Sequence, residues 1–245
     1  MSDPGDAELA ARLAEAAGRI LLEVRDSKLF SGKSLGKAGD RIANALLMEA
    51  VAEQRPNDAV LSEESSDDKT RLQCSRVWII DPLDGTREYG EGRTDWAVHV
   101  GLAVDGTAVA GAVALPGLGL VLRSDNPPPL TDVNRRLRML VSRTRPAAEA
   151  VAVAEAMDAE LTPMGSAGAK AMAVVRGEAD IYLHSGGQYE WDNCAPVAVA
   201  LAAGLHVTRM DGSLMRYNNE NTWLPDLLIC RPELASRAQA AIAAL

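Results

Sequence analysis

Two aspartates, Asp81 and Asp84, follow directly on the apolar, β-branched residues 77–80. Such a run is typical of a buried strand, and a proline turn between the aspartates can place their oxygens on one side of the chain. Carboxylate oxygens, with water and substrate phosphate, are the ligands that Mg²⁺ prefers. Gly85 and Thr86 come next, and their backbone N–H groups can approach an anion closely. The pattern indicates metal-assisted phosphate chemistry, although residues 82–85 also fit an ordinary Asp-Gly turn.

Two further acidic sites have the same character. Glu63 and Glu64 end the short apolar run that begins at Val60, and Asp192 stands immediately before the Ala-rich residues 193–203. Asp192 can cap that helix or turn its side chain toward a cation. Carboxylates gathered in an apolar cleft repel one another unless a divalent ion neutralises them. Metal binding therefore accounts for all three sites together.

Residues 61–65, 78–86 and 191–192, in this order and at this spacing, resemble the inositol monophosphatase superfamily. That superfamily is Mg²⁺-dependent and lithium-sensitive. It includes inositol monophosphatases, some fructose-1,6-bisphosphatases and the CysQ-type 3′(2′),5′-bisphosphate nucleotidases. The likeness extends from the region of Asp40 to the C-terminus. It implies an α/β (α+β) fold, a layered α-β-α-β-α sandwich with the metals between its two halves.

The resemblance also implies roles for individual residues, with two or three Mg²⁺ ions as the cofactor. The implied metal ligands are Glu64, Asp81, the carbonyl of Leu83, Asp84 and Asp192. Glu64 and Asp81 also belong to the implied catalytic group, in which Thr86, paired with Asp40, orients or deprotonates the attacking water. This chain lacks the extended pattern that precedes the aspartate in the family. Asp40 therefore also fits the first turn or N-cap of a helix over residues 42–53, after a mobile loop at 30–37.

The substrate-binding candidates come from the same resemblance: Gly85, Thr86, Gly165, Ser166, Lys170, His184 and Tyr189. Ser166 is equally explained as a helix N-cap. His184 stands where inositol-specific members place a glutamate, and its ring suits a second phosphate or a base better than a polyol. Tyr189 can stack on adenine or simply be a packed aromatic.

These residues favour hydrolysis of 3′-phosphoadenosine 5′-phosphate to AMP and phosphate, a step of sulfate assimilation. Inositol 1-phosphate or fructose 1,6-bisphosphate is the alternative substrate. An alternative of another class is a catalytically silent, metal-dependent regulatory module, which the altered region around Asp40 leaves open. Phosphate release with Mg²⁺ separates the enzyme from the silent module.

The composition fits a cytoplasmic enzyme with a substantial core, since 47% of the 245 residues are hydrophobic. No run of eighteen apolar residues and no basic-then-apolar leader is present, so we expect no membrane partner. A net charge of -9 argues against a nucleic acid polymer as partner, while a small phosphorylated substrate remains compatible because bound cations change the local sign. The oligomeric state stays open, with a homodimer as one option.

The chain alternates between helical and strand-like segments, and the prolines at 127–129 mark the expected boundary between two halves, 1–129 and 130–245. The first half carries most of the expected metal ligands, and the second carries Asp192 and the substrate-binding residues. The patterns predict helices over 7–24, 42–53, 147–157 and 169–175, from 193 and from 232, and strands over 96–104, 107–115, 119–122, 139–142, 180–183 and 226–230.

Overall fold

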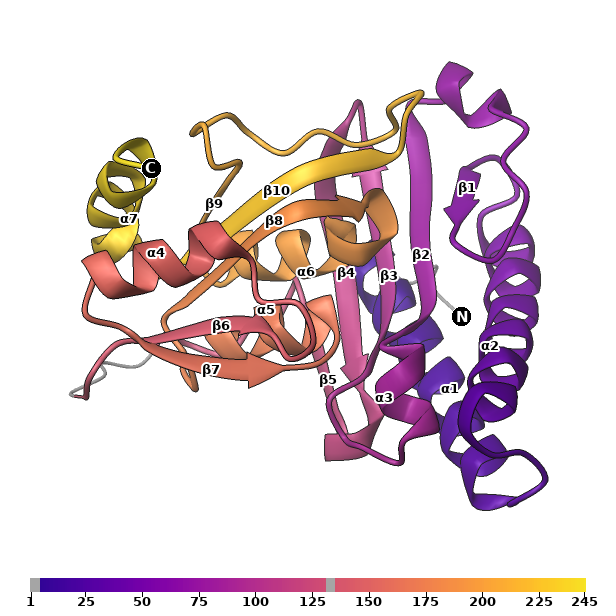
Figure 1. Cartoon of the computed structure of the whole chain (residues 1–245). Helices are drawn as coiled ribbons and strands as arrows, with labels where there is room; N and C mark the ends of the chain where they lie inside the picture. Colours follow the sequence, from indigo (N-terminus) through magenta and orange to yellow (C-terminus); the bar gives the residue numbers. More distant parts are fainter. Residues whose placement is uncertain (1–4, 131–134) are drawn as a thin grey trace.

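The protein is described by a computed structural model that covers residues 5–130 and 135–245. Its strands form two five-stranded sheets, and helices lie between the sheets and on both outer sides (Figure 1). The predicted α-β-α-β-α sandwich is confirmed. Within the two described ranges, no helix has the length and apolar character needed to cross a membrane.

The first sheet has the strand order β1-β2-β3-β4-β5, with β1 parallel to β2 and the other neighbours antiparallel. Its strands are β1 (Ala59–Ser62), β2 (Arg76–Asp84), β3 (Ala97–Val104), β4 (Thr107–Leu115) and β5 (Leu120–Arg123). The meander expected over residues 96–122 is therefore present. In β2 the pairing register shifts between Asp81 and Asp84. Residues three apart on a regular strand point to opposite faces, so this bulge is what lets both aspartates serve one site.

Two long helices, α1 (Asp6–Asp26) and α2 (Gly32–Gln54), cover the outer face of this sheet. The expectation of a mobile loop at residues 30–37 is wrong, because α2 already begins at Gly32, with Ser31 as its N-cap. Asp40 consequently lies in the helix interior and is neither an N-cap nor a first-turn residue. Gly36 lies within this helix. A Cβ there would lie 2.5 Å from Thr86 Cγ2, so the glycine allows α2 to pack against that threonine.

The second sheet has the order β7-β6-β8-β10-β9. Its strands are β6 (Arg138–Ser142), β7 (Glu160–Met164), β8 (Ile181–Tyr189), β9 (His206–Thr208) and β10 (Trp223–Cys230). Helices α4 (Ala148–Ala156) and α7 (Ala235–Ala243) cover its outer face. The short β9 was not predicted, and β8 runs six residues beyond the expected 180–183 strand. Along the chain, the proline segment at 127–129 follows the last strand of the first sheet and precedes the first strand of the second. Its role as a domain boundary stays a prediction.

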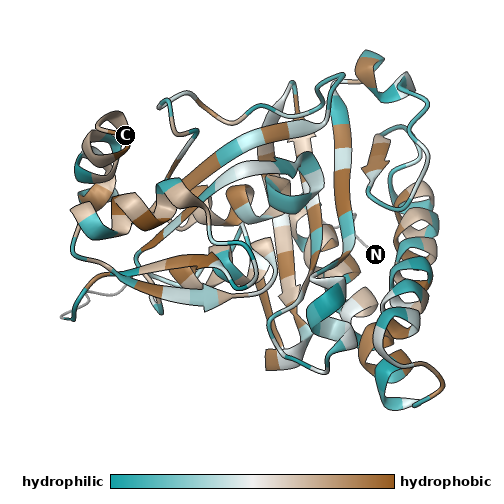
Figure 2. Cartoon of the chain, in the orientation of Figure 1, coloured by the Kyte–Doolittle hydropathy of each residue, from teal (hydrophilic) through white to brown (hydrophobic). Residues whose placement is uncertain are grey.

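The middle layer consists of α5 (Ala167–Val175) and α6 (Glu190–Ala202), which are buried between the two sheets. Hydrophobic residues run along the strands, and hydrophilic ones gather on loops and on the outward side of α2 (Figure 2). The approach of α6 to the first sheet requires glycines on β3 and β4. A Cβ on Gly101 would lie 2.8 Å from the backbone nitrogen of Ala195, and one on Gly111 3.0 Å from its Cα. These glycines therefore fix how closely the two halves meet.

Replacing Gly101 with alanine should destabilise the protein, because the added methyl group would meet the backbone of α6. Overpacking of this kind costs about 1–3 kcal/mol, measurable as a lower midpoint of urea unfolding. Gly5→Ala is the control, since nothing lies within 4 Å of a Cβ at Gly5, and its effect should stay below about 1 kcal/mol. Equal midpoints for the two variants would show that α6 does not depend on this close approach.

Candidate active site

Three carboxylates converge where the end of β2 meets the start of α6. One oxygen each from Asp81, Asp84 and Asp192 lies within 4.8 Å of the other two. Asp81 and Asp84 are buried, and the first of them is fixed in place because its Oδ1 accepts the backbone N–H of Leu83 at 3.0 Å. Segments more than 100 residues apart in sequence thus supply one acidic cluster, as the sequence predicted for these three side chains.

Glu63, the first of the two adjacent glutamates, completes this cluster. Its backbone N–H donates to the carbonyl of Ile80 at 3.2 Å, which holds the end of β1 beside β2. Its carboxyl group shares a hydrogen bond with that of Asp81. Glu64, the residue expected from the sequence, acts electrostatically on Asp40, as Glu63 also does. Both glutamates lie in the turn that follows β1, and the carboxyl group of Glu63, not that of Glu64, interacts with Asp81. The structure therefore favours Glu63 over Glu64 as the glutamate of the site.

One oxygen of Asp84 is held by the protein itself. Asp84 Oδ2 accepts hydrogen bonds from the Ser166 hydroxyl and from the backbone N–H of Gly168 at 2.7 Å, and it lies 3.1 Å from His99 Nε2. Burial acts to raise the pKa of Asp84, but the charge of His99 and these hydrogen bonds outweigh it and lower the pKa to about 2. The carboxylate is therefore ionised and held in place through this oxygen.

His99, on β3, links the two elements that carry these carboxylates. The side chain is fully buried, with Nδ1 3.0 Å from the carbonyl of Trp191 and Nε2 beside Asp84. Burial opposes a charged ring, yet the neighbouring carboxylate raises the pKa of His99. Gly168 makes room for it, because a Cβ there would lie 2.0 Å from Nε2. The sequence offered one signal for this residue, a histidine within an otherwise apolar strand.

The remaining carboxylates of the cluster are compensated too weakly to offset burial and their neighbours' charges. Burial, followed by the charge of Glu63, raises the pKa of Asp81 well above its usual value. Burial likewise raises the pKa of Glu63 to about 7 and that of Asp192 to about 6. Asp192 lies in the first turn of α6 after Tyr189 as N-cap, and its Oδ2 accepts the Tyr189 N–H at 2.6 Å. Hard, mutually repelling oxygens of this kind fit a divalent cation.

Asp40 and Thr86 lie together at the edge of the cluster. The Thr86 hydroxyl donates to the carbonyl of Leu83 at 3.1 Å and also interacts with the carboxyl group of Asp40. Burial and the charges of the two glutamates raise the pKa of Asp40 to about 7. Its Oδ1 is buried without a hydrogen-bond partner in the described parts of the chain. Such an unpaired buried oxygen is rare and leaves Asp40 free to accept a further hydrogen bond or a proton.

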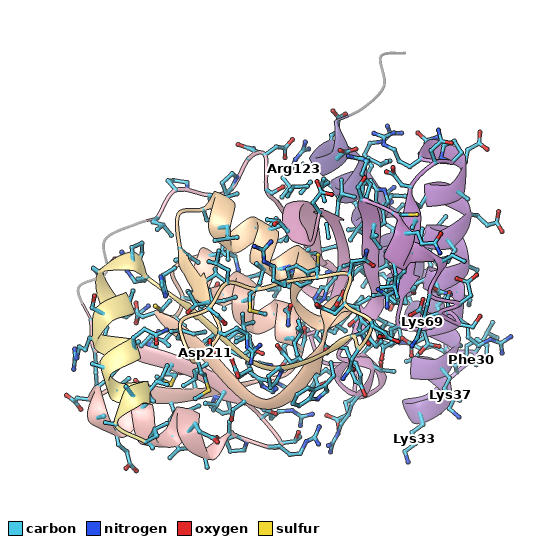
Figure 3. All side chains as sticks on the ribbon, turned by 90° about the horizontal axis from the view of Figure 1, so that it is seen from above. Phe30, Lys33, Lys37, Lys69, Arg123 and Asp211 are labelled. Carbon is cyan, nitrogen blue, oxygen red and sulfur yellow. The ribbon has the colours of Figure 1, made fainter. Side chains whose placement is uncertain are left out.

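A pocket of about 340 Å³ adjoins the carboxylates. Asp84 and Asp192 line it, together with six of the seven expected substrate-binding residues, Gly85, Gly165, Ser166, Lys170, His184 and Tyr189. Thr86, the seventh, lines a neighbouring hollow of about 630 Å³ beside Lys33 and Lys37, two lysines that project outward from the start of α2 (Figure 3). The pocket thus joins the acidic cluster to the second half of the chain.

Within this pocket Ser166 and Lys170 are already engaged by the protein. Ser166 caps α5 by accepting the N–H of Ala169 at 3.0 Å, so the alternative of an N-cap is confirmed, and its hydroxyl also donates to Asp84. The ammonium group of Lys170 donates to the carbonyls of Gly165 at 3.0 Å and Ser166 at 2.6 Å. Both side chains shape the turn that holds Asp84, and their contact with a substrate stays a prediction.

Arg143 and Arg145 also line the pocket, and the sequence had not indicated either. Arg143 donates to Glu88 at 2.8 Å and to Glu91 at 2.9 Å. The basic stretch at residues 135–138 does not line this pocket. Its first member, Arg135, pairs with Asp180 at 2.6 Å and lies outside the lining of this pocket.

Comparison with known proteins agrees with this geometry. The sequence pattern of the Inositol monophosphatase family matches residues 6–245. The chain belongs to the inositol monophosphatase family. A relative from Mycobacterium leprae, named 3′-phosphoadenosine 5′-phosphate phosphatase, is 51% identical over 94% of this chain and 90% of its own. The 3′(2′),5′-bisphosphate nucleotidase CysQ of Escherichia coli is 28% identical over 87% of this chain and 94% of its own.

Solved structures of the inositol monophosphatase family share the fold. The crystal structure of CysQ from Bacteroides thetaiotaomicron superposes with a TM-score of 0.80, at 24% sequence identity, over 92% of this chain and 97% of that one. At this identity the likeness concerns the fold alone. It places the sandwich described above among those of known family members.

The raised pKa values predict how stability depends on pH and on Mg²⁺. A carboxyl group whose pKa rises on folding binds its proton more tightly in the folded state, so the metal-free protein loses stability as pH rises from about 4 to about 7, the raised value of Glu63. Mg²⁺ should offset this loss. Thermal unfolding should therefore show a larger Mg²⁺-induced increase in Tm at pH 8 than at pH 5.

Two variants make this measurement specific. Asp81→Asn removes a carboxylate of the cluster and should reduce the Mg²⁺-induced increase at pH 8. Asp211→Asn removes the same charge from an exposed outer loop (Figure 3) and should leave the increase unchanged. An increase in Tm that is equal at both pH values would contradict the assignment of a cation to these carboxylates.

Proposed function

We propose that this protein is a Mg²⁺-dependent phosphomonoesterase that hydrolyses 3′-phosphoadenosine 5′-phosphate to AMP and phosphate in sulfate assimilation. The observation that carries the proposal is the convergence of uncompensated carboxylates at one end of a pocket suited to a nucleotide. The names of the relatives at 51% and 28% identity support the same substrate class.

The proposed cofactor is two or three Mg²⁺ ions. The residues that would hold them are Glu63, Asp81, the carbonyl of Leu83, Asp84 and Asp192, with Glu63 in place of the Glu64 first expected. When bound, paired divalent ions stabilise charge that develops on a phosphate and lower the pKa of water. The uncompensated Asp81 and the oriented oxygen of Asp84 support this set.

Thr86 and Asp40 are proposed to prepare the attacking water. The Thr86 hydroxyl donates to Leu83 and interacts with Asp40, so its oxygen is held at the edge of the cluster. With a pKa of about 7, Asp40 can accept a proton near neutral pH. When the Thr86 hydroxyl turns from Leu83 to donate to Asp40, a proton leaving water can pass through it to that carboxylate. The water oxygen then forms the new bond to phosphorus as the bond between phosphorus and the ribose 3′-oxygen breaks, and the 3′-oxygen takes up a proton from a solvent water.

The walls of the pocket favour a nucleotide over a polyol. Tyr189 is 46% exposed, and its ring stacks on Trp191 with 4.8 Å between centroids and 10° between planes. Only one face of Tyr189 is covered in this way, so the other can stack on a base. His184 lies deeper, and burial lowers the pKa of its ring. A neutral imidazole at this position cannot replace the glutamate that inositol-specific members are expected to use for binding the hydroxyls of inositol.

Inositol 1-phosphate and fructose 1,6-bisphosphate remain the alternative substrates, since the same carboxylates would serve any phosphomonoester. A silent regulatory module is less favoured. Asp40 lies beside Thr86 and keeps an unpaired buried oxygen, as a group that takes part in chemistry would.

Phosphate release from the three substrates tests the proposal directly. With Mg²⁺, 3′-phosphoadenosine 5′-phosphate should give the highest kcat/KM, and Li⁺ should inhibit. Asp84→Asn should lower kcat at least about 100-fold, because it weakens an ionised member of the cluster, while far-ultraviolet circular dichroism stays unchanged. A faster reaction with inositol 1-phosphate would overturn the substrate, and an inactive wild type would favour the regulatory module.

Thr86→Ala should lower kcat by about 100-fold and change KM for the substrate little, since the hydroxyl is proposed to act on water. Thr107→Ala, at an exposed position on β4, is the matched control and should keep full activity. If Thr86→Ala changed only KM, the threonine would contact the substrate and have no part in preparing the water.

A further inference from the structure

Four basic side chains line the substrate pocket, and three of them are compensated or neutral. Arg143 is paired with two glutamates. Lys170 is 5% exposed and donates to two backbone carbonyls. His184 Nε2 lies 3.0 Å from the carbonyl of Gly187, and burial favours its neutral form by lowering the pKa. None of these three presents a free positive charge to a ligand.

Arg145 is different. Its guanidinium has no carboxylate partner among residues 5–130 and 135–245, in a chain whose net charge is -9. It lies on the connection between β6 and α4, where its backbone N–H donates to the Ser142 hydroxyl at 3.2 Å. Its charge acts on His184, and both side chains line the same pocket. The pocket therefore has carboxylates on one part of its lining and one uncompensated arginine on another.

We propose that Arg145 binds the second, non-reacting phosphate of a nucleoside bisphosphate. This inference rests on the function proposed above, in which the reacting phosphate lies at the carboxylate cluster. A guanidinium donates two parallel hydrogen bonds to phosphate oxygens, which makes it well suited to such a group. Arg145 thereby selects substrates with two phosphates over monoesters such as inositol 1-phosphate, which offer it nothing to bind.

The remaining surface cations fit this role less well. Lys33 and Lys37 line the separate hollow beside Thr86 and point outward from α2 (Figure 3). Neither lies on the wall formed by His184 and Tyr189, where the base and ribose of a nucleotide are proposed to bind. A phosphate attached to that nucleotide would meet Arg145 on the same wall.

The test compares two substrates that differ only in the second phosphate. Arg145→Gln should raise KM for 3′-phosphoadenosine 5′-phosphate about tenfold or more, since it removes hydrogen bonds to a charged group, and should change KM for 3′-AMP less than twofold. kcat should stay within about threefold for both substrates. Arg145→Lys keeps the charge but loses the two parallel hydrogen-bond donors of the guanidinium, so it should raise KM for 3′-phosphoadenosine 5′-phosphate less than Arg145→Gln does. Arg12→Gln removes the same charge from an exposed position on α1 and should change neither KM.

Binding of 5′-AMP, measured by calorimetry, gives a readout without turnover, because this product retains only the second phosphate. Its affinity should fall with Arg145→Gln, whereas the affinity for adenosine should not. Equal changes for both substrates, or no change for either, would overturn the role of Arg145 and leave the proposed function standing. A wild type that does not hydrolyse 3′-phosphoadenosine 5′-phosphate would overturn the proposed function and, with it, this role.

Discussion

Repulsion among closely placed carboxylates is the constraint on which the site depends. Glu63, Asp81, Asp84 and Asp192 supply four acidic groups to one small region. Asp84 alone among them has a lowered pKa, through His99, Ser166 and the Gly168 N–H. Full compensation by the protein would leave no electrostatic reason to bind a cation. The fold stabilises one ligand firmly and leaves the others to be neutralised by what binds.

The sandwich holds these groups together through its middle layer. α6 carries Asp192 at its first turn and packs closely on the first sheet, whose β2 ends in Asp84. His99 contacts both of these elements, so the distance between the ligands depends on how closely helix and sheet approach. That approach requires glycine at positions 101 and 111, where a Cβ would meet the backbone of α6. The packing of α6 on the first sheet therefore also sets the distances between the carboxylates of the cation site.

The sequence predicts what is encoded locally. An apolar run that ends in Asp81 and Asp84, and a helical stretch that begins near Asp192, carry their own signals. The choice between Glu63 and Glu64 does not, because it depends on how the turn after β1 orients the two side chains. The start of α2 is not marked locally either, because a glycine such as Gly36, which is needed for contact with Thr86, is in sequence more typical of a helix break.

His99 and Arg145 illustrate the second limit of the sequence. Their roles come from partners far away along the chain, Asp84 and Trp191 for the first and His184 for the second. No spacing pattern marks such residues, because the contacts exist only after the two sheets and the middle helices have packed. Isolated polar residues at the ends of strands therefore need the folded chain before they can be interpreted.

The chemistry and the choice of substrate come from different parts of the molecule. Most of the carboxylates, with Thr86 and Asp40, come from the first sheet and α2. The walls that would contact a base, ribose or second phosphate come from the loop at 142–145 and from β8. A substitution at Arg145 leaves the hydrogen bonds that support the acidic cluster unchanged, because Arg145 makes none of them. A fold arranged in this way can change the phosphate ester that it hydrolyses through a few wall residues while keeping its catalytic group.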